Sequence, residues 1–286
     1  MDVLGFDKII FKASHNSYER DETLSEQLKF NSNKPYNCGC MGLELDIWRH
    51  SSAYTPSQSI NKNYFTVSHT TPGSTTLSSY FNQILEWHNG NPKHNVVLIT
   101  LDIKSSEGGY DNFHNEIDTY LKCYFNENLI FKPKQLIKNA ALSLCENVIN
   151  TGWPAISASE LIGKFIFCLS GNKDWKSTYA KTNLNARYCF SDLDKSDSDD
   201  AVSPPIKGDI VFFNFHIYDK NKGIWLNTIP LFAKKRLITR AFIANSENNW
   251  NNCIKANVSA IATDKVSNHD WAKVSDSRAY RVKANN

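Results

Sequence analysis

Short apolar runs recur along the chain, and segments with helical spacing of their hydrophobic residues separate most of them. The runs are rich in β-branched and aromatic residues, which is typical of buried strands. Eight strands are predicted in this way, at residues 8–13, 42–47, 64–68, 96–103, 164–169, 210–215, 237–244 and 259–263. Helices are predicted between them, at residues 24–30, 77–88, 113–125, 133–148, 225–236 and 247–257.

The alternation of strands and helices favours a parallel sheet covered by helices. Eight such strands in a chain of 286 residues predict an α/β fold of the (β/α)8 TIM-barrel type, either regular or distorted and incompletely closed. Residues 1–286 are expected to form this barrel as one domain. An open doubly wound sheet is the alternative, but no Gly-rich turn of the GxGxxG or P-loop type supports a nucleotide site.

Polar side chains capable of chemistry stand near the ends of the first four predicted strands. Because the active site of such a barrel lies at the carboxyl ends of its strands, we expect these side chains to meet at one rim. They are His15 and Asn16 after the first strand, Glu44 and Asp46 in the second, His69 after the third, and Asp102 near the end of the fourth. Each strand is otherwise apolar, which argues against a solvated face.

Glu44 and Asp46 alternate with Leu43, Leu45 and Ile47 in the second predicted strand. Because alternate side chains of a strand point to opposite faces, both carboxylates are expected on one face, about 6–7 Å apart. Taken alone, the pair is equally consistent with two solvated acids on an edge strand. The other polar groups at the same rim favour a shared site.

The oxygen-bearing side chains at this rim indicate a hard cation. They are Asn16, Glu44, Asp46 and Asp102. An amide and three carboxylates favour Ca²⁺, with Mg²⁺ second, over zinc. His15 and His69 then remain for proton transfer or for stabilising a developing oxyanion. A cation with two imidazoles suits the cleavage of a phosphodiester.

Composition excludes several other classes of function. The formal net charge of +3 is too small to indicate a nucleic-acid partner. The seven cysteines include no zinc-like pair of CxxC motifs, and several lie in apolar runs, which favours reduced thiols in the core. Residues 191–205 are polar and acidic, and they predict a solvated loop before the sixth predicted strand.

The amino-terminal residues lack the basic segment, apolar run and cleavage site of a secretory signal. No window approaches the roughly 20 apolar residues that span a bilayer. We therefore expect a soluble monomer without a transmembrane segment. Secretion by a signal-free route, or delivery into a host cell as a toxin or effector, would agree with this pattern.

The motifs at the rim resemble those of a known enzyme family. The segments His15-Asn16-Ser17-Tyr18, Gly42-Leu43-Glu44-Leu45-Asp46 and Ser68-His69-Thr70, with the strand around Asp102, are similar to the X-region of phosphoinositide-specific phospholipase C. The calcium-dependent bacterial branch is the more similar one. The resemblance is most specific over residues 8–104 and extends to residues 237–266. It implies a (β/α)8 barrel that cleaves an inositol phospholipid at a membrane surface through a cyclic phosphodiester.

The resemblance also implies a role for each matched residue. The calcium ligands would be Asn16, Glu44, Asp46 and Asp102. His15 would stabilise the pentacoordinate phosphorus, and His69 would protonate the diacylglycerol oxygen as it leaves. The inositol 2-hydroxyl would be the internal nucleophile, and its general base would be Glu44 or another metal-bound carboxylate. The metal-independent bacterial enzymes carry an arginine in place of the ion, whereas this chain has an acidic cluster.

Two departures from the family pattern concern the ion and the headgroup. Asp102 stands where the animal enzymes often have a longer Glu. After Gly163-Lys164 those enzymes carry lysines that hold the inositol 4- and 5-phosphates, and residues 165–170 of this chain contain none. The expected substrate is therefore plain phosphatidylinositol, or a lipid anchor that contains it.

Three further residues are candidates for substrate binding, namely Lys104, Arg240 and His216. The run Asp102-Ile103-Lys104 also resembles glycerophosphodiester phosphodiesterases and sphingomyelinase D-like enzymes, which makes that group the alternative enzyme class. In that group Lys104 would lie beside the phosphate, and a solvated lysine that closes the strand is the equally favoured interpretation. Asp264 follows the last predicted strand, where it could orient a histidine. The non-enzymatic alternative is an inactive barrel that binds lipid headgroups.

Overall fold

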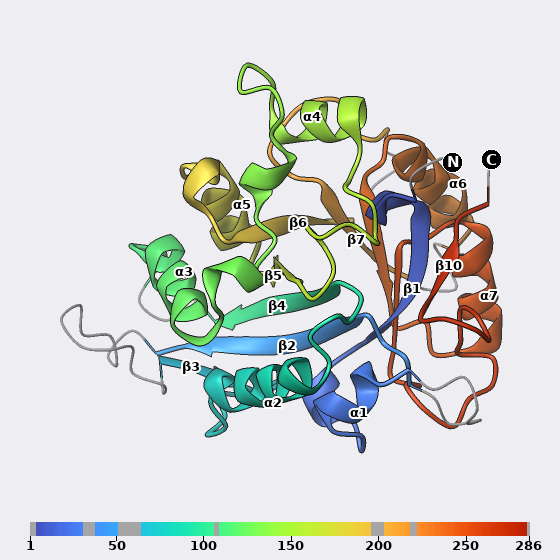
Figure 1. The fold of residues 1–286 in the computed structure, drawn as a ribbon, viewed down its shortest axis with the longest axis horizontal. Coiled ribbons are helices and arrows are strands. Elements are labelled where there is room, and N and C mark those ends of the chain that lie inside the picture. Colours follow the sequence, from blue (N-terminus) through green and yellow to red (C-terminus); the bar gives the residue numbers. More distant parts are fainter. Residues whose placement is uncertain are drawn as a thin grey trace.

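The computed structural model describes residues 4–30, 38–50, 64–105, 109–195, 203–217 and 222–284. Within these residues, eight parallel strands close into a barrel that helices surround (Figure 1). The barrel strands are β1 (Ile9–Ser14), β2 (Gly42–Arg49), β4 (Val97–Ser105), β5 (Phe165–Gly171), β6 (Cys189–Lys195), β7 (Phe212–His216), β8 (Ile238–Phe242) and β9 (Ala260–Thr263). The fold is a TIM barrel, as the alternation of elements predicted.

The barrel closes where β1 lies between β9 and β2. β1 and β9 form four residue pairs, whereas β1 and β2 share the single pair Ala13↔Gly42. The backbones approach so closely there that a Cβ atom at position 42 would lie 2.7 Å from the Cβ atom of Ala13. The Met41 N–H also donates to the Lys12 carbonyl at 2.9 Å. Closure therefore depends on a short seam that only glycine fits.

In the part of the chain that the structure describes, two antiparallel strands lie outside the ring. β3 (Phe65–Val67) pairs with β2, and β10 (Tyr280–Val282) pairs with β1 (Figure 1). The prediction that residues 64–68 form a barrel strand was therefore wrong. Their apolar pattern has a different cause, because Phe65 and Val67 pack in the layer between the barrel and the helices.

The barrel strand that sequence reasoning missed is β6, which runs into the segment predicted to be a solvated loop. Residues 191–195 belong to the strand, and residues 196–202 lie outside the described part of the chain. Asp192 and Asp194 turn towards Lys176, whose Nζ lies 2.6 Å from Asp192 Oδ1 and also contacts Asp194. The inner face of β6 is therefore ionic, which removes the apolar pattern by which a strand is recognised.

The helices of the described residues lie outside the strands. They are α1 (Leu24–Leu28), α2 (Leu77–Gly90), α3 (Phe113–Tyr124), α4 (Leu144–Thr151), α5 (Lys173–Lys181), α6 (Lys222–Lys234) and α7 (Glu247–Lys255). In α2, the buried residues Leu77, Phe81, Ile84 and His88 recur at helical spacing. The helix predicted at 133–148 is instead a 3₁₀ turn followed by α4, which begins at a capping box of Ser143 and Glu146. The helix α5 was not predicted from the sequence.

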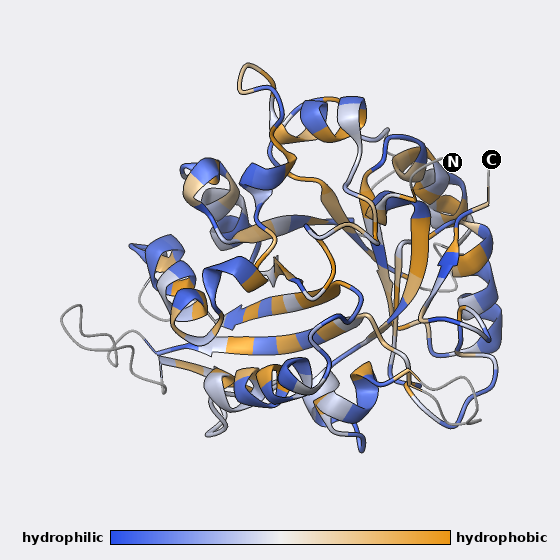
Figure 2. Cartoon of the chain, viewed as in Figure 1, coloured by the Kyte–Doolittle hydropathy of each residue, from blue (hydrophilic) through white to orange (hydrophobic). Residues whose placement is uncertain are grey.

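The two faces of the barrel strands differ in chemistry. Leu43, Leu45 and Ile47 of β2 pack towards the helices, whereas Glu44 and Asp46 between them face the barrel interior. The colours along β2 and β4 alternate accordingly (Figure 2). Polar groups thus collect towards the carboxyl ends of the strands, which is where the predicted site lies.

Six of the seven cysteines are buried, and no disulfide joins cysteines in the described ranges. This agrees with the prediction of reduced core thiols. Over the same ranges, no helix has the length and apolar character needed to cross a membrane.

Candidate active site

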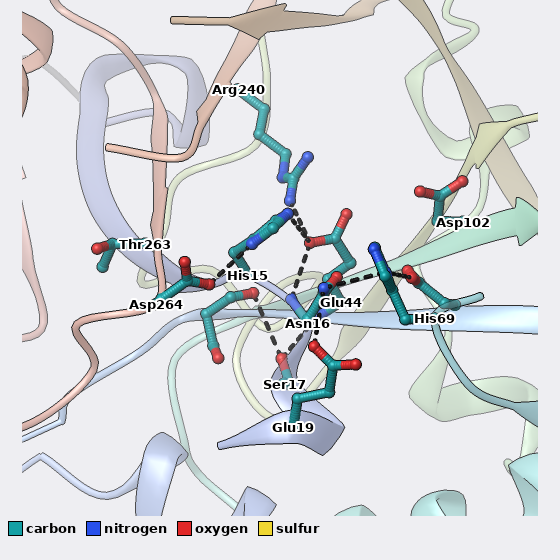
Figure 3. Close-up of polar contacts among 12 residues, drawn as sticks. His15, Asn16, Ser17, Glu19, Glu44, His69, Asp102, Arg240, Thr263 and Asp264 are labelled. Carbon is teal, nitrogen blue, oxygen red and sulfur yellow. Dashed lines mark hydrogen bonds and ion pairs between the residues drawn. The ribbon is translucent and has the colours of Figure 1, made fainter. Parts of the chain in front are cut away.

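The segment that follows β1 turns sharply into the site (Figure 3). Asn16 adopts the left-handed conformation, with φ 44° and ψ 58°, which asparagine tolerates better than most residues. The turn lets Ser17 Oγ accept the Glu44 N–H at 2.8 Å and donate to the Ser14 carbonyl at 3.3 Å. The Asn16 N–H donates to Glu44 Oε2 at 3.1 Å. The end of β1 is thereby tied to the acidic face of β2.

Three carboxylates from two neighbouring strands converge beside this turn. Asp46 on β2 and Asp102 on β4 are direct partners in a parallel ladder, and Glu44 precedes Asp46 by one period of the strand. One oxygen of each carboxylate lies within 4.8 Å of the others. Asp46 Oδ1 and Asp102 Oδ1 are buried and have no hydrogen-bond partner among the described residues. Carboxylate oxygens arranged in this way fit a hard divalent cation.

Asn16 lies at the edge of this carboxylate cluster. Its side-chain Nδ2 is 3.1 Å from Glu19 Oε2 and 3.2 Å from His69 Nδ1. A cation would bind the amide oxygen of Asn16, because an amide nitrogen is not a ligand for calcium. The four predicted metal ligands are therefore neighbours, and their donor set is chemically suited to Ca²⁺.

Two cations accompany the three carboxylates. Arg240 Nη2 donates to Glu44 Oε2 at 2.7 Å. Lys104 Nζ lies 3.1 Å from Asp46 Oδ2 and 3.0 Å from Asp102 Oδ2. When all five groups are ionised, the three carboxylates and the two cations together therefore carry one net negative charge.

The pKa values follow from this balance of burial and charge. Burial tends to raise the pKa of Glu44, but the Arg240 guanidinium and other donors outweigh burial, and this pKa is lowered. Burial and the Glu44 charge raise the pKa of Asp46 despite its contact with Lys104. Burial, opposed by Lys104 and reinforced by the two other carboxylates, raises the pKa of Asp102 to about 6. A bound dication would favour the ionised form of all three groups.

His15 lies beside Glu44 and is oriented by a carboxylate from the far end of the chain. β1 and β9 are adjacent with Ser14 opposite Thr263, so the residues that follow both strands meet. His15 Nδ1 lies 2.8 Å from Asp264 Oδ1, and His15 Nε2 lies 3.9 Å from Glu44 Oε2. Burial tends to raise the pKa of Asp264, but the contacts with His15, the hydrogen bond from Asn245 and the charge of Arg20 together outweigh burial, and this pKa is lowered.

His69 reaches the site from outside the ring. β3 runs back along β2, which brings His69 Nδ1 to 3.0 Å from Asp46 Oδ2. Its side chain is 48% exposed, so a substrate can reach the ring. Nδ1 can donate to Asp46 or accept from Asn16, but it cannot do both in one tautomer. In the tautomer that donates to Asp46, Nε2 is left to exchange a proton. His15 and His69 flank Glu44 in the close-up view (Figure 3).

Arg240 and His216 lie at the same rim and share an aromatic neighbour. The His216 ring stacks on Phe242 with 4.5 Å between centroids, and the Phe242 ring is 6.1 Å from that of His15. The Arg240 guanidinium lies 5.3 Å from the Phe242 centroid. The structure thus brings all the predicted site residues together, although Lys104 contacts carboxylates rather than standing free beside the site.

Sequence reasoning missed several groups that support the site. The Tyr18 hydroxyl donates to Asp46 Oδ2 at 2.9 Å, and burial together with that carboxylate raises the pKa of Tyr18, which keeps it a donor. Phe242 was also missed, although its spacing of two residues from Arg240 placed it on the same strand face. Asn214, which accepts from Arg240 Nη1 at 3.1 Å, gave no signal in a run of aromatic residues.

Comparisons with known proteins point to one family. A family model described as phosphoinositide phospholipase C, Ca²⁺-dependent, matches residues 47–205, which is more than half of the chain. No curated protein matches the chain.

Solved structures share the fold. One is the calcium-dependent phosphoinositol-specific phospholipase C from a Gram-negative Pseudomonas species in its apo form, with a TM-score of 0.70, 18% identity and coverage of 98% of this chain and 95% of that chain. Another is a Ca²⁺-dependent phosphatidylinositol-specific phospholipase C from Streptomyces antibioticus, with a TM-score of 0.65, 17% identity and coverage of 91% and 95%.

Proposed function

Because the chain belongs to the family of Ca²⁺-dependent phosphoinositide phospholipases C, we propose that it cleaves phosphatidylinositol into diacylglycerol and inositol phosphate. The observation that carries this proposal is the convergence of three carboxylates and two imidazoles at one barrel rim. The family match does not favour the glycerophosphodiester phosphodiesterase and sphingomyelinase D-like alternatives. We further propose that residues 1–286 act as a single-domain monomer on a phospholipid surface.

The ligands proposed for Ca²⁺, or less favourably Mg²⁺, are Asn16, Glu44, Asp46 and Asp102. When bound, the ion supplies positive charge that stabilises the phosphoryl oxygens and lowers the pKa of the attacking hydroxyl. The partnerless oxygens of Asp46 and Asp102 support this assignment. Glu44, Asp46 and the His15 segment precede the start of the family match, so their roles rest on geometry.

In the proposed reaction the inositol 2-hydroxyl oxygen attacks phosphorus, and the bond from phosphorus to the diacylglycerol oxygen breaks. Glu44 accepts the hydroxyl proton, and His69 gives a proton to the leaving oxygen. His15, oriented by Asp264, stabilises the charge that builds up on the phosphoryl group. The first products are a cyclic inositol phosphodiester and diacylglycerol, and water then opens the ring.

The headgroup proposed for this site carries no phosphate beyond the diester. Arg240 and His216 border the rim near Phe242 and are the proposed contacts to the inositol ring. On β6, which pairs with the His216 strand β7, the Asp194 side chain is 46% exposed and would repel additional phosphates. Turnover of phosphatidylinositol 4,5-bisphosphate at an equal rate would contradict this part of the proposal.

The test is release of water-soluble phosphate esters from phosphatidylinositol vesicles, with and without a chelator. We expect turnover that the chelator abolishes and that His69→Ala lowers at least about a hundredfold, because the leaving oxygen loses its acid. His114→Ala, on α3 with its ring stacked on Tyr110, is the matched control and should retain activity.

Three outcomes would contradict the proposal. Undiminished turnover in the presence of chelator would contradict the proposed role of the metal ion. A headgroup released without its phosphate would indicate a phospholipase D. Vesicle binding without turnover, unaffected by His15→Ala and His69→Ala, would indicate the inactive lipid-binding barrel.

A further inference from the structure

Lys104 stands at an irregularity in the sheet that directs it into the carboxylate cluster. β2 and β4 pair residue by residue up to Ile47↔Ile103, and the next pair is Trp48↔Ser105. Lys104 is therefore the extra residue of a β-bulge, with no partner opposite it on β2. Bulges bend a strand locally and re-aim its side chains, and they are common beside active sites.

The bulge places one ammonium group between two carboxylates. Lys104 Nζ is 3.1 Å from Asp46 Oδ2 and 3.0 Å from Asp102 Oδ2, so it bridges both. These are the carboxylates whose other oxygens, Asp46 Oδ1 and Asp102 Oδ1, lack hydrogen-bond partners among the described residues. Arg240 does not play this part, because its contact with a carboxylate is to Glu44.

A dication that bridged Asp46 and Asp102 would meet this ammonium group. Calcium binds carboxylate oxygens at about 2.3–2.6 Å. Because Nζ lies 3.1 and 3.0 Å from the two Oδ2 atoms, an ion on the same oxygens would lie no farther than about 5.7 Å from Nζ. Like charges at that distance repel strongly in a partly buried site. The Lys104 side chain is 23% exposed, so Nζ can leave the carboxylates for solvent and remain hydrated.

We propose that Lys104 is a built-in counter-cation that competes with the divalent ion for Asp46 and Asp102 and thereby weakens the affinity of the site. This inference rests on the proposed function for the identity of the ion. In this arrangement the single positive charge of the lysine offsets one of the two carboxylate charges whenever the ion leaves them. Once the ion displaces it, Nζ lies at the rim as a cation for the substrate phosphate.

The test is calorimetric titration of Ca²⁺ into the full chain in the absence of lipid. Lys104→Met should bind Ca²⁺ at least tenfold more tightly than the unmodified chain, and Lys104→Gln serves as a second neutral variant should the first not fold. Lys104→Arg, which keeps the charge, should bind within about threefold of the unmodified chain. Lys134→Met removes an exposed charge on the 3₁₀ turn before α4 and should leave the affinity unchanged.

The outcomes separate this inference from the proposed function. If the unmodified chain binds Ca²⁺ and both neutral variants bind it equally or more weakly, Lys104 organises the carboxylates rather than competing for them, and the inference is wrong while the proposed function stands. If neither the unmodified chain nor any variant binds Ca²⁺, the proposed metal site is wrong, and so is this inference. If Asp102→Asn binds Ca²⁺ as tightly as the unmodified chain, the ion lies elsewhere. That result contradicts both this inference and the proposed metal ligands.

Discussion

His15 and Asp264 illustrate how residues at opposite ends of the chain form one hydrogen-bonded pair at the candidate site. They are 249 positions apart, yet their side chains meet at 2.8 Å because β9 is the neighbour of β1 in the closed ring. The Asp264 carboxylate holds the imidazole through Nδ1 and leaves Nε2 facing Glu44. Such second contacts fix the tautomer and orientation of a functional histidine.

Asp264→Asn should therefore lower kcat about a hundredfold and change KM little, because the substituted side chain is of equal size but holds His15 less firmly. Steady-state kinetics on phosphatidylinositol micelles measure both quantities. Asn268→Ala, on the same loop, is the control. A large rise in KM with kcat unchanged would show that Asp264 serves substrate binding instead.

Individual side chains of the site were predictable to different degrees. The period of two around Glu44 and Asp46 indicated a shared strand face, and the structure brings both beside Asp102. Lys104 was predicted at the site, but its contact with Asp46 and Asp102 could not be predicted, because a bulge depends on how two strands pair and leaves no pattern in residue types. Asn214 shows the same limit, since its partner Arg240 lies on another strand.

At the scale of elements, the sequence predicted the number of barrel strands but assigned one of them wrongly. The run at 64–68 is apolar and became a strand, but it pairs antiparallel with β2 outside the ring. β6 took its place, hidden by Asp192 and Asp194, which pair with the buried Lys176 of α5. Hydrophobic patterning finds strands that are buried by apolar contacts, and it fails where a barrel interior is ionic.

The seam between β1 and β2 gives a prediction about glycine. Gly42→Ala should destabilise the protein by about 1–3 kcal/mol and reduce turnover, because its Cβ would lie 2.7 Å from Ala13 Cβ and push apart the strands that carry His15 and Glu44. Denaturant unfolding and activity measure the two effects. Gly90→Ala is the matched control, since a Cβ at that helical position has nothing within 4 Å. Equal stability of the two variants would contradict the role of the seam.

At the scale of the whole molecule, the buried Lys283, which follows β10, is expected to make the stability of the fold depend on pH. Lys283 Nζ donates to Ser259 Oγ at 2.7 Å, and its residue follows β10. Burial lowers the pKa of Lys283 to about 7, with attraction to Asp7 opposing and repulsion from Lys8 adding to the effect. Between about pH 7 and the ordinary value of 10.5, the unfolded chain binds a proton at this site that the folded chain does not.

Stability should therefore rise with pH through that window, by up to about 5 kcal/mol from this residue. Lys283→Met should flatten the rise, which denaturant unfolding between pH 6.5 and pH 10 would measure. Lys255→Met, at the exposed end of α7, should leave the slope as it is. A slope that persists in Lys283→Met would place the pH dependence at other groups, such as the buried Lys12.

His69 follows β3, so the proposed proton donor lies outside the ring of strands that carries the carboxylates. Because β3 pairs with β2 outside the ring, changes in β3 leave the pairing of the eight barrel strands intact. Variation in β3 would therefore change how the leaving oxygen is protonated and keep the proposed ion site as it is.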